Sequence, residues 1–247
     1  MSHLRDISKA TLRAFQRRDD ASRAKVIAAL QRWLLPEWRL PDPATAWHSD
    51  AFFNAYLDQF GELRRFNAPR RWNLYQLALQ TVNIPGDTAE CGSFEGASSW
   101  LICHTFRETG KTHYIFDSFE GISEPSEKDG GHWSQGMLAH SEEGVRKRLA
   151  EFPNLETLAG WIPDRFPDVT DRQFAFVHVD VDLEIPTRDS FEFFYPRLSQ
   201  GGILVCDDYG SALCPGATET IDNFLADKPE KMVGLSAGGG FMIRRGD

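Results

Sequence analysis

Two stretches decide how this chain folds: residues 177–182, Val-His-Val-Asp-Val-Asp, and residues 203–208, Ile-Leu-Val-Cys-Asp-Asp. Each begins as an apolar run of strand length and ends in closely spaced acids. In a parallel α/β sheet, ligands bind beyond the carboxyl ends of neighbouring strands. The four carboxylates are therefore expected to converge at one edge of a sheet, and their convergence indicates a metal site.

Strands and helices alternate along the chain around these two stretches. Helical crossovers of sufficient length are expected at 97–109, 142–151 and 187–198. Strands are expected at 88–91, 113–117, 155–159, 174–180 and 203–208, followed by a late pair at 232–235 and 241–244 that is joined by a glycine-rich turn. The pattern predicts an α/β fold with a doubly wound, mostly parallel seven-stranded sheet that ends in an antiparallel hairpin.

The N-terminal part has a different pattern, and it predicts a helical extension over residues 1–69 before the α/β domain at 70–247. Further helices are expected near 51–60 and 71–82. Apolar residues recur at roughly helical spacing at Leu12, Phe15, Ile27 and Leu30, near Trp33. Such a face must be buried, either on its own domain or on another copy of the chain. We expect a homo-oligomer.

The composition limits the class of protein. With 247 residues, 41% of them hydrophobic, the chain can bury one substantial core. A net charge of −9 argues against a nucleic-acid partner, which would require a basic face. The four cysteines lack CxxC spacing, and no stretch approaches the ~20 apolar residues that span a bilayer. We expect a cytoplasmic protein that acts on small molecules and has no membrane partner.

The junction after the first strand reads Glu-Cys-Gly-Ser-Phe-Glu-Gly-Ala-Ser-Ser over residues 90–99. Gly92 and Gly96 let the backbone approach a ligand, and the start of the next helix supplies free N–H donors. A ligand with a carboxylate suits this turn. The G-x-G-x-x-G pattern of dinucleotide enzymes is not present, which disfavours NAD. A tight turn without any ligand is the alternative interpretation.

The next two strands also end in candidate ligand contacts. Asp117, followed by Ser118, can accept hydrogen bonds from both hydroxyls of a ribose, or it can cap a helix. Trp161 can border an adenine ring or lie in the core. Residues 122–140 lack periodicity, and we interpret them as a lid. In this lid, Trp133 is expected to pack on a substrate ring, with loop anchoring as the alternative, and His132 is an alternative base.

Together, four runs resemble the macrocin O-methyltransferase (TylF-type) family: residues 89–96, 116–121, 179–183 and 198–210. The resemblance covers about residues 70 to 227. It implies a class I S-adenosylmethionine-dependent enzyme. Characterised members methylate sugar hydroxyls on macrolide and aminocoumarin antibiotics with a divalent metal, usually magnesium, so the resemblance implies S-adenosylmethionine and Mg²⁺ as cofactors.

The resemblance also implies roles for individual residues. Asp182 is the implied base, and Asp117 would hold the cofactor's ribose. The implied metal ligands are Asp180, Asp207 and Asp208. Residues expected around the cofactor are Glu90, Gly92, Ser93, Gly96, Ser98, Asp117, Ser118, Trp161 and Asp180, and the resemblance implies that Glu90, Gly92 and Ser98 lie near its methionine part. Apart from the resemblance, we expect His132, Trp133 and Tyr209 around the substrate. The chain departs from the family at Glu95, which places a negative charge near a cationic cofactor.

The chemistry of the acids agrees with these roles. Magnesium prefers hard oxygen ligands, and a metal-bound alcohol gives up its proton more easily to a neighbouring carboxylate. Asp207 and Asp208 can alternatively form a turn that caps the next helix, and His178 is interpreted as a core histidine. The expected activity is O-methylation of a sugar or a sugar-bearing metabolite. The alternatives are a phenolic or catechol-like acceptor and a non-catalytic metabolite-binding module.

Overall fold

The computed structural model describes residues 26–30, 33, 46–62, 65 and 67–246. The chain divides into two compact units between Ala55 and Tyr56, and the larger one holds the sheet. In the smaller unit, Ile27, Leu30 and Trp33 are exposed. Leu12 and Phe15 lie outside the described residues. The self-associating face, the homo-oligomer and the domain boundary between residues 69 and 70 therefore stay predictions.

The secondary structure agrees closely with the predicted ranges. The helices are α3 (Ala51–Phe60), α4 (Ala68–Gln80), α5 (Ala97–Phe106), α6 (Glu142–Arg148), α7 (Glu184–Phe194) and α8 (Pro215–Phe224), with short 3-10 helices η1 (Ala46–Ser49), η2 (Glu127–Asp129), η3 (Phe166–Val169) and η4 (Tyr195–Arg197). The strands are β1 (Asp87–Cys91), β2 (His113–Asp117), β3 (Leu155–Ala159), β4 (Phe174–Val179), β5 (Leu198–Cys206), β6 (Val233–Gly234) and β7 (Gly240–Ile243). In the part of the chain that the structure describes, no helix is long and apolar enough to span a membrane.

The seven strands form one sheet in the order β3-β2-β1-β4-β5-β7-β6. Strands β1 to β5 run parallel, and β7 is antiparallel to both β5 and β6. The predicted mostly parallel sheet with a terminal hairpin is thereby confirmed. Strand β5 begins at Leu198, earlier than the predicted residue 203. Gly201 and Gly202 interrupt its apolar pattern, and a side chain at Gly202 would lie 2.8 Å from the carbonyl of Ser199.

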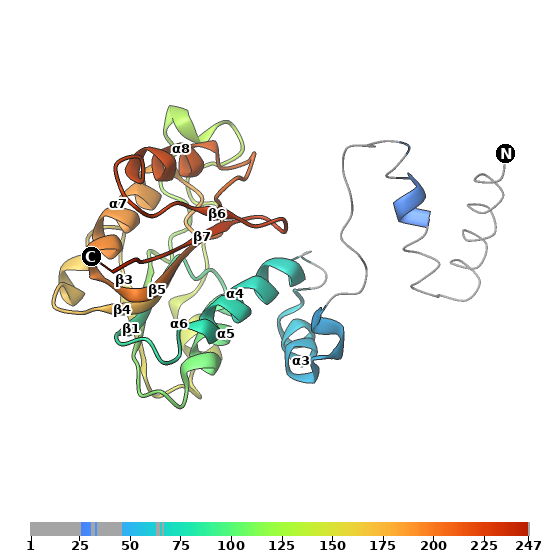
Figure 1. Cartoon of the computed structure of the whole chain (residues 1–247), viewed down its shortest axis with the longest axis horizontal. Coiled ribbons are helices and arrows are strands. Elements are labelled where there is room, and N and C mark those ends of the chain that lie inside the picture. The colour runs from blue at the N-terminus through green and yellow to red at the C-terminus, as the bar shows by residue number, and fades with distance from the viewer. Residues whose placement is uncertain (1–25, 31–32, 34–45, 63–64, 66, 247) are drawn as a thin grey trace. The chain divides into compact units, whose positions relative to one another are not determined.

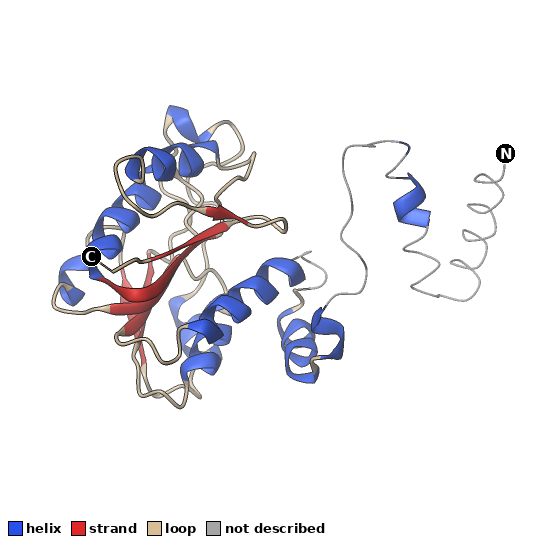
Figure 2. Cartoon of the chain, viewed as in Figure 1, coloured by secondary structure: helices blue, strands red, loops and turns tan. Residues whose placement is uncertain are grey.

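Helices cover both faces of the sheet (Figures 1 and 2). Helix α4 packs on α5 on one face, and α7 packs on α8 on the other. Along β1, Ala89 and Cys91 belong to the apolar core beneath α7. Glu90 points to the opposite face and contacts Ser99 on α5. The face beneath α5 therefore contains buried polar groups, whereas the face beneath α7 is apolar.

The core beneath α7 fixes the end of β2 that faces the ligand site, and also the start of β4 at the opposite edge of the sheet. Phe116 on β2 contacts Phe166 edge to face, with ring centroids 5.1 Å apart, and Phe174 on β4 contacts Phe194 in the same manner at 5.0 Å. All four rings are buried. Burying such a side chain stabilises the fold by about 1.5–3 kcal/mol. Because Phe116 directly precedes Asp117, this packing holds the acid at the end of β2.

Candidate active site

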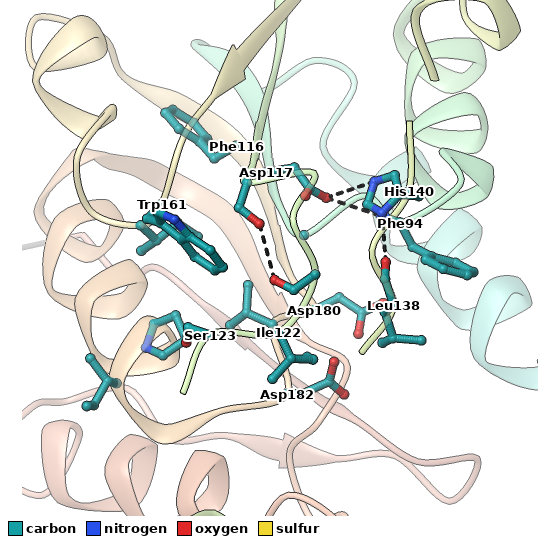
Figure 3. Close-up of a pocket in the computed structure, with 17 residues that line it drawn as sticks. Phe94, Phe116, Asp117, Ile122, Ser123, Leu138, His140, Trp161, Asp180 and Asp182 are labelled. Carbon is teal, nitrogen blue, oxygen red and sulfur yellow. Dashed lines mark hydrogen bonds and ion pairs between the residues drawn. The ribbon is translucent and has the colours of Figure 1, made fainter. Parts of the chain in front are cut away.

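A cavity of about 300 Å³ lies at the carboxyl ends of β1, β2 and β4, the edge of the sheet that the sequence predicts. Figure 3 shows side chains from these strand ends and from the segment 122–140 around it. The predicted site residues in its wall are Gly92, Asp117, Ser118, Trp161, Asp180 and Asp182. The cavity therefore brings together the ends of strands that lie far apart in the sequence.

The turn after β1 depends on a glycine. Gly92 has a φ of +80°, and a Cβ atom there would lie 2.0 Å from the carbonyl oxygen of Asp180. Only a residue without a side chain lets the ends of β1 and β4 approach so closely. Gly96, the residue directly before α5, has a φ of +81°. Three other residues predicted near the cofactor are buried and, among the described residues, do not line the cavity: Glu90, Ser93 and Ser98.

Asp117 orders the loop after β1. Its Oδ2 accepts hydrogen bonds from the amide and hydroxyl of Ser93, at 2.7 and 3.0 Å, and from the amide of Phe94 at 3.2 Å. Its Oδ1 accepts one from the amide of Phe119 at 2.8 Å. Burial raises the pKa of Asp117, but the neighbouring His140 and the hydrogen bonds from the amides of Ser93 and Phe119 outweigh burial and lower it. One lone pair of Oδ1 remains for a ligand hydroxyl.

His140 lies beside Asp117 and was not predicted. Its Nε2 is 3.5 Å from Oδ2 of Asp117 (Figure 3). Its ring stands edge-on to Phe94 and Phe119, with ring centroids at 5.5 and 5.2 Å. Its Nδ1 is 2.9 Å from the carbonyl oxygen of Leu138. Burial lowers the pKa of His140, but Asp117 more than compensates and the net shift is upward. No sequence spacing links residues 117 and 140, so only the folded chain reveals this pair.

The predicted lid borders the cavity. The amide of Ile122 donates to Met137, and that of Gly136 donates to Ile122, at 2.7 and 2.9 Å, which closes the segment on itself. Ile122, Ser123, Leu138 and His140 contribute to the cavity wall. Among the described residues, this segment therefore covers one side of the cavity.

Three predicted substrate residues point to other partners. The indole N–H of Trp133 donates to the carbonyl of Leu213 at 3.1 Å, and the ring of His132 packs on Trp133 at 4.7 Å. The hydroxyl of Tyr209 donates to Asp222 at 2.8 Å. All three lie outside the described cavity wall. In this conformation Trp133 acts as a loop anchor, which was the alternative interpretation of this residue.

The four acids converge at the edge of the cavity, as predicted, but in two neighbouring groups. Ligand atoms of His178, Asp180 and Asp207 lie within 4.8 Å of one another. A second group, with the same spread, consists of Asp182, Asp208 and Cys214. The amide of Asp182 donates to Oδ2 of Asp208 at 2.8 Å, so the second group is held together through the backbone after β4.

Two arginines in the first turn of α4 face the first group. The Arg70 guanidinium contacts both the carboxylate and the carbonyl oxygen of Asp207. Nη1 of Arg71 is 3.9 Å from Asp180, and its Nε is 3.1 Å from Glu62. The sequence did not indicate this role, because a pair of arginines at the start of a helix is typical of a solvated face. Their charges partly balance the acids.

The charge balance differs between the two groups. Burial raises the pKa of both Asp182 and Asp208. The Asp208 carboxylate raises the pKa of Asp182 further, whereas the Asp180 and Asp207 carboxylates raise that of Asp208. Burial also raises the pKa of Asp207, but His178, Arg70 and Arg71 outweigh burial and lower it. Asp182 and Asp208 therefore retain uncompensated negative charge when ionised. A hard divalent cation fits the carboxylate oxygens that the two groups bring together, and at Asp208 it would offset the repulsion.

Glu95 is directed away from the acids. Its Oε2 lies 2.8 Å from Nη2 of Arg65 and 3.6 Å from Nη1 of Arg148. The negative charge of Glu95 is therefore paired with arginines. Among the described residues that line the cavity, Glu95 is not included.

The strand order, the glycine turn after β1 and the acid after β2 define the class I methyltransferase fold. The family model Macrocin-O-methyltransferase (TylF) matches residues 69–231, and the chain belongs to this family.

Curated relatives support this assignment. The chain is 31% identical over 160 residues to a demethyldecarbamoylnovobiocin O-methyltransferase from Streptomyces niveus, covering 58% of this chain and 60% of that protein. It is 32% identical over 165 residues to 8-demethyl-8-(2,3-dimethoxy-alpha-L-rhamnosyl)-tetracenomycin-C 4'-O-methyltransferase from Streptomyces olivaceus, covering 60% and 63%. The chain thus spans less than two thirds of the length of these relatives. The solved structure of the O-methyltransferase NovP matches with a TM-score of 0.61 at 26% identity, over 72% of this chain and 80% of that one.

Proposed function

We propose that this chain is an S-adenosylmethionine-dependent O-methyltransferase that methylates a hydroxyl of a sugar or a sugar-bearing metabolite, with Mg²⁺ as its metal. The observation that carries the proposal is the position of Asp182. Its carboxylate lines the same cavity as Asp117, and it adjoins Asp208. Relatives with names that refer to novobiocin and a rhamnosyl tetracenomycin support the class of acceptor.

The cofactor would occupy the part of the cavity between β1 and β2. Asp117 would accept one hydrogen bond from a ribose hydroxyl, and Trp161 and Phe94 would border the adenine. Gly92 keeps the end of β1 free of side-chain atoms at this point. When bound, S-adenosylmethionine supplies a methyl group activated by the positive sulfonium. The His140–Asp117 contact would hold the end of the covering segment near the ribose.

The metal would be held by Asp180, Asp207 and Asp208. All three offer hard carboxylate oxygens, the donor type that suits magnesium. A bound divalent cation lowers the pKa of an alcohol that it contacts. Arg70 and Arg71 would limit the net charge of the acids around it.

Asp182 would accept the proton of the acceptor hydroxyl. Its backbone φ of +62° is in the left-handed region, which costs a non-glycine residue about 1–3 kcal/mol. The turn is held by the hydrogen bond to Asp208. Ile122, Leu138 and Ile185 supply an apolar wall that would exclude water from the reacting atoms. Alignment of the hydroxyl with the methyl group would provide much of the acceleration.

The decisive experiment offers the purified chain S-adenosylmethionine, Mg²⁺ and two acceptor panels, one of deoxysugar glycosides and one of catechols. Mass spectrometry detects a methyl group on the product. Methylation of a glycoside hydroxyl is the expected result. Methylation of the catechols alone would show that the acceptor is a catechol-like compound and not a sugar. Tight S-adenosylhomocysteine binding without transfer to either panel would contradict catalysis and favour a metabolite-binding module.

A further inference from the structure

We propose that His178, held in place by Glu90, is a positioning residue for the metal-binding carboxylates, with Asp207 as its immediate partner. The inference rests on the metal site of the proposed function. It adds to that site two residues from beneath the sheet edge, neither of which is expected to bind the metal directly.

Glu90 and His178 form a fully buried pair on the two central strands. Nδ1 of His178 is 2.8 Å from Oε1 of Glu90, and neither residue has exposed surface. The hydroxyl of Ser99 donates to the other carboxylate oxygen. Glu90 and His178 are also direct neighbours in the register between β1 and β4. Backbone pairing and the side-chain contact therefore fix the orientation of the imidazole.

The other end of the imidazole faces the acids. Nε2 of His178 lies 3.9 Å from Oδ1 of Asp207, an ion-pair contact that is longer than a hydrogen bond. This nitrogen is buried and has no hydrogen-bond partner among the residues that the structure describes. A buried polar atom without a partner is costly in a purely structural core. Nε2 of His178 faces Asp207 and Asp180, and this orientation gives the side chain a role in positioning these two acids.

Two side chains orient the carboxylate of Asp207, one at each oxygen. Arg70 contacts Oδ2 from α4, and His178 approaches Oδ1 from β4. The Arg70 side chain is 30% exposed, whereas His178 is fully buried. His178 is therefore the more rigid of the two contacts. Residues that orient metal-binding side chains typically change metal affinity 10- to 100-fold when they are replaced.

Two substitutions of one residue separate this role from simple packing. The amide nitrogen of glutamine can take the place of the imidazole Nε2, whereas that of asparagine can take the place of Nδ1. His178→Asn should keep a contact with Glu90 and lose the contact with Asp207. His178→Gln should keep a donor near Asp207. We expect Mn²⁺ affinity to fall about 10- to 100-fold in His178→Asn and less than ~5-fold in His178→Gln.

The measurement is Mn²⁺ binding to the full-length chain, followed by electron paramagnetic resonance of the free ion. His113→Asn is the matched control, because Nε2 of His113 lies 3.9 Å from Glu90 and the residue is on β2, away from Asp207. It should leave Mn²⁺ affinity unchanged. S-adenosylhomocysteine binding and the thermal midpoint of each variant show whether the fold is intact.

Equal Mn²⁺ affinity for the wild type and a folded His178→Asn variant would overturn the positioning role. So would equal losses in the asparagine and glutamine variants, or a nitrogen directly coordinated to Mn²⁺ in the electron spin echo spectrum, which would make His178 a ligand. A wild type that binds no Mn²⁺ would refute both this inference and the metal of the proposed function. That outcome is distinct from metal binding that is insensitive to residue 178.

Discussion

The backbone amide of Asp182 donates a 2.8 Å hydrogen bond to the carboxylate of Asp208. The proposed base and a proposed metal ligand are therefore held together, although they follow two different strands, β4 and β5. The thiol of Cys214 lies 3.8 Å from Asp182 and 3.6 Å from Asp208. Because the contact between the two acids uses the backbone of Asp182, its side chain can be changed without removing that hydrogen bond.

Asp182→Asn should lower the rate of methyl transfer on the order of 10²- to 10⁴-fold, because it keeps the size of the side chain and removes its ability to accept a proton. Single-turnover kinetics with saturating cofactor measures the chemical step. Affinities for Mn²⁺ and S-adenosylhomocysteine should change little. A near-normal rate would exclude Asp182 as the base, whereas a collapse of metal affinity would make it a ligand.

Chelation should abolish methyl transfer, and added Mg²⁺ should restore it. Without a cation, the carboxylates at this edge repel one another and the acceptor hydroxyl has no ligand to hold it. Asp208→Asn should reproduce the effect of the chelator, with little change in cofactor affinity. Calorimetry with S-adenosylhomocysteine provides this control. Full turnover in excess chelator would refute metal assistance.

S-adenosylhomocysteine should raise the thermal midpoint of the protein, because a ligand that binds only the native state stabilises it by mass action. Asp117→Asn should reduce this shift, since the residue lines the cavity and keeps one lone pair for a ligand. The melting curve of Asp117→Asn without ligand measures the stability that the protein loses when the loop after β1 loses its contacts with Asp117. An unchanged midpoint at saturating ligand, with no heat of binding, would rule out the cofactor assignment.

Gly92→Ala should destabilise the protein more than Gly110→Ala. Both glycines have positive φ, +80° and +72°, so each substitution incurs about 1–2 kcal/mol of backbone strain. Only Gly92 would also place a Cβ atom 2.0 Å from the carbonyl of Asp180, whereas nothing lies within 4 Å at Gly110. Denaturant unfolding gives both free energies. Equal losses would show that close strand approach is unimportant.

Glu230 should make the stability of the fold sensitive to acid. It accepts hydrogen bonds from Tyr195, Arg244 and the amide of Arg245 at 2.6, 2.8 and 2.9 Å. Burial raises the pKa of Glu230, but these contacts outweigh burial and lower it from 4.5 to about 2. A lowered pKa stabilises the folded state above the unfolded value of 4.5, and this contribution is lost as the pH falls toward 2.

Glu230→Gln keeps the shape of the side chain and removes its ionisation. The free energy of unfolding should therefore fall less steeply for the variant than for the wild type between pH 4.5 and about 2. Urea unfolding at a series of pH values gives both slopes. Parallel curves would contradict the contribution of Glu230.

The sequence predicted the sheet well because each strand end carries a local signal. The acid at 117 and the acids after 179 and 206 follow buried apolar runs, and parallel strands bring such ends together. The predicted start of strand β5 was too late, because Gly201 and Gly202 interrupt the apolar pattern near its beginning. The position of the cavity follows from topology alone.

The sequence was less informative about contacts between distant segments. Arg70 and Arg71 lie more than a hundred residues from Asp180 and Asp207 in the sequence, and nothing local indicates that a helix start will face those acids. Side-chain direction in an irregular segment is equally hidden. His140 faces the cavity, whereas Trp133 bonds to Leu213, although both belong to residues 122–140.

The left-handed backbone at Asp182 has a practical consequence for anyone who engineers this chain. In one step, Asp182→Gly would relieve the unfavourable φ of +62° and remove a partly buried carboxyl group that repels Asp208. A library screened only for heat resistance should therefore enrich changes at this position, and those clones would lack the proposed base. Thermal stability and catalysis favour different residues at position 182. Efforts to make the protein more thermostable should therefore keep Asp182 and change other positions.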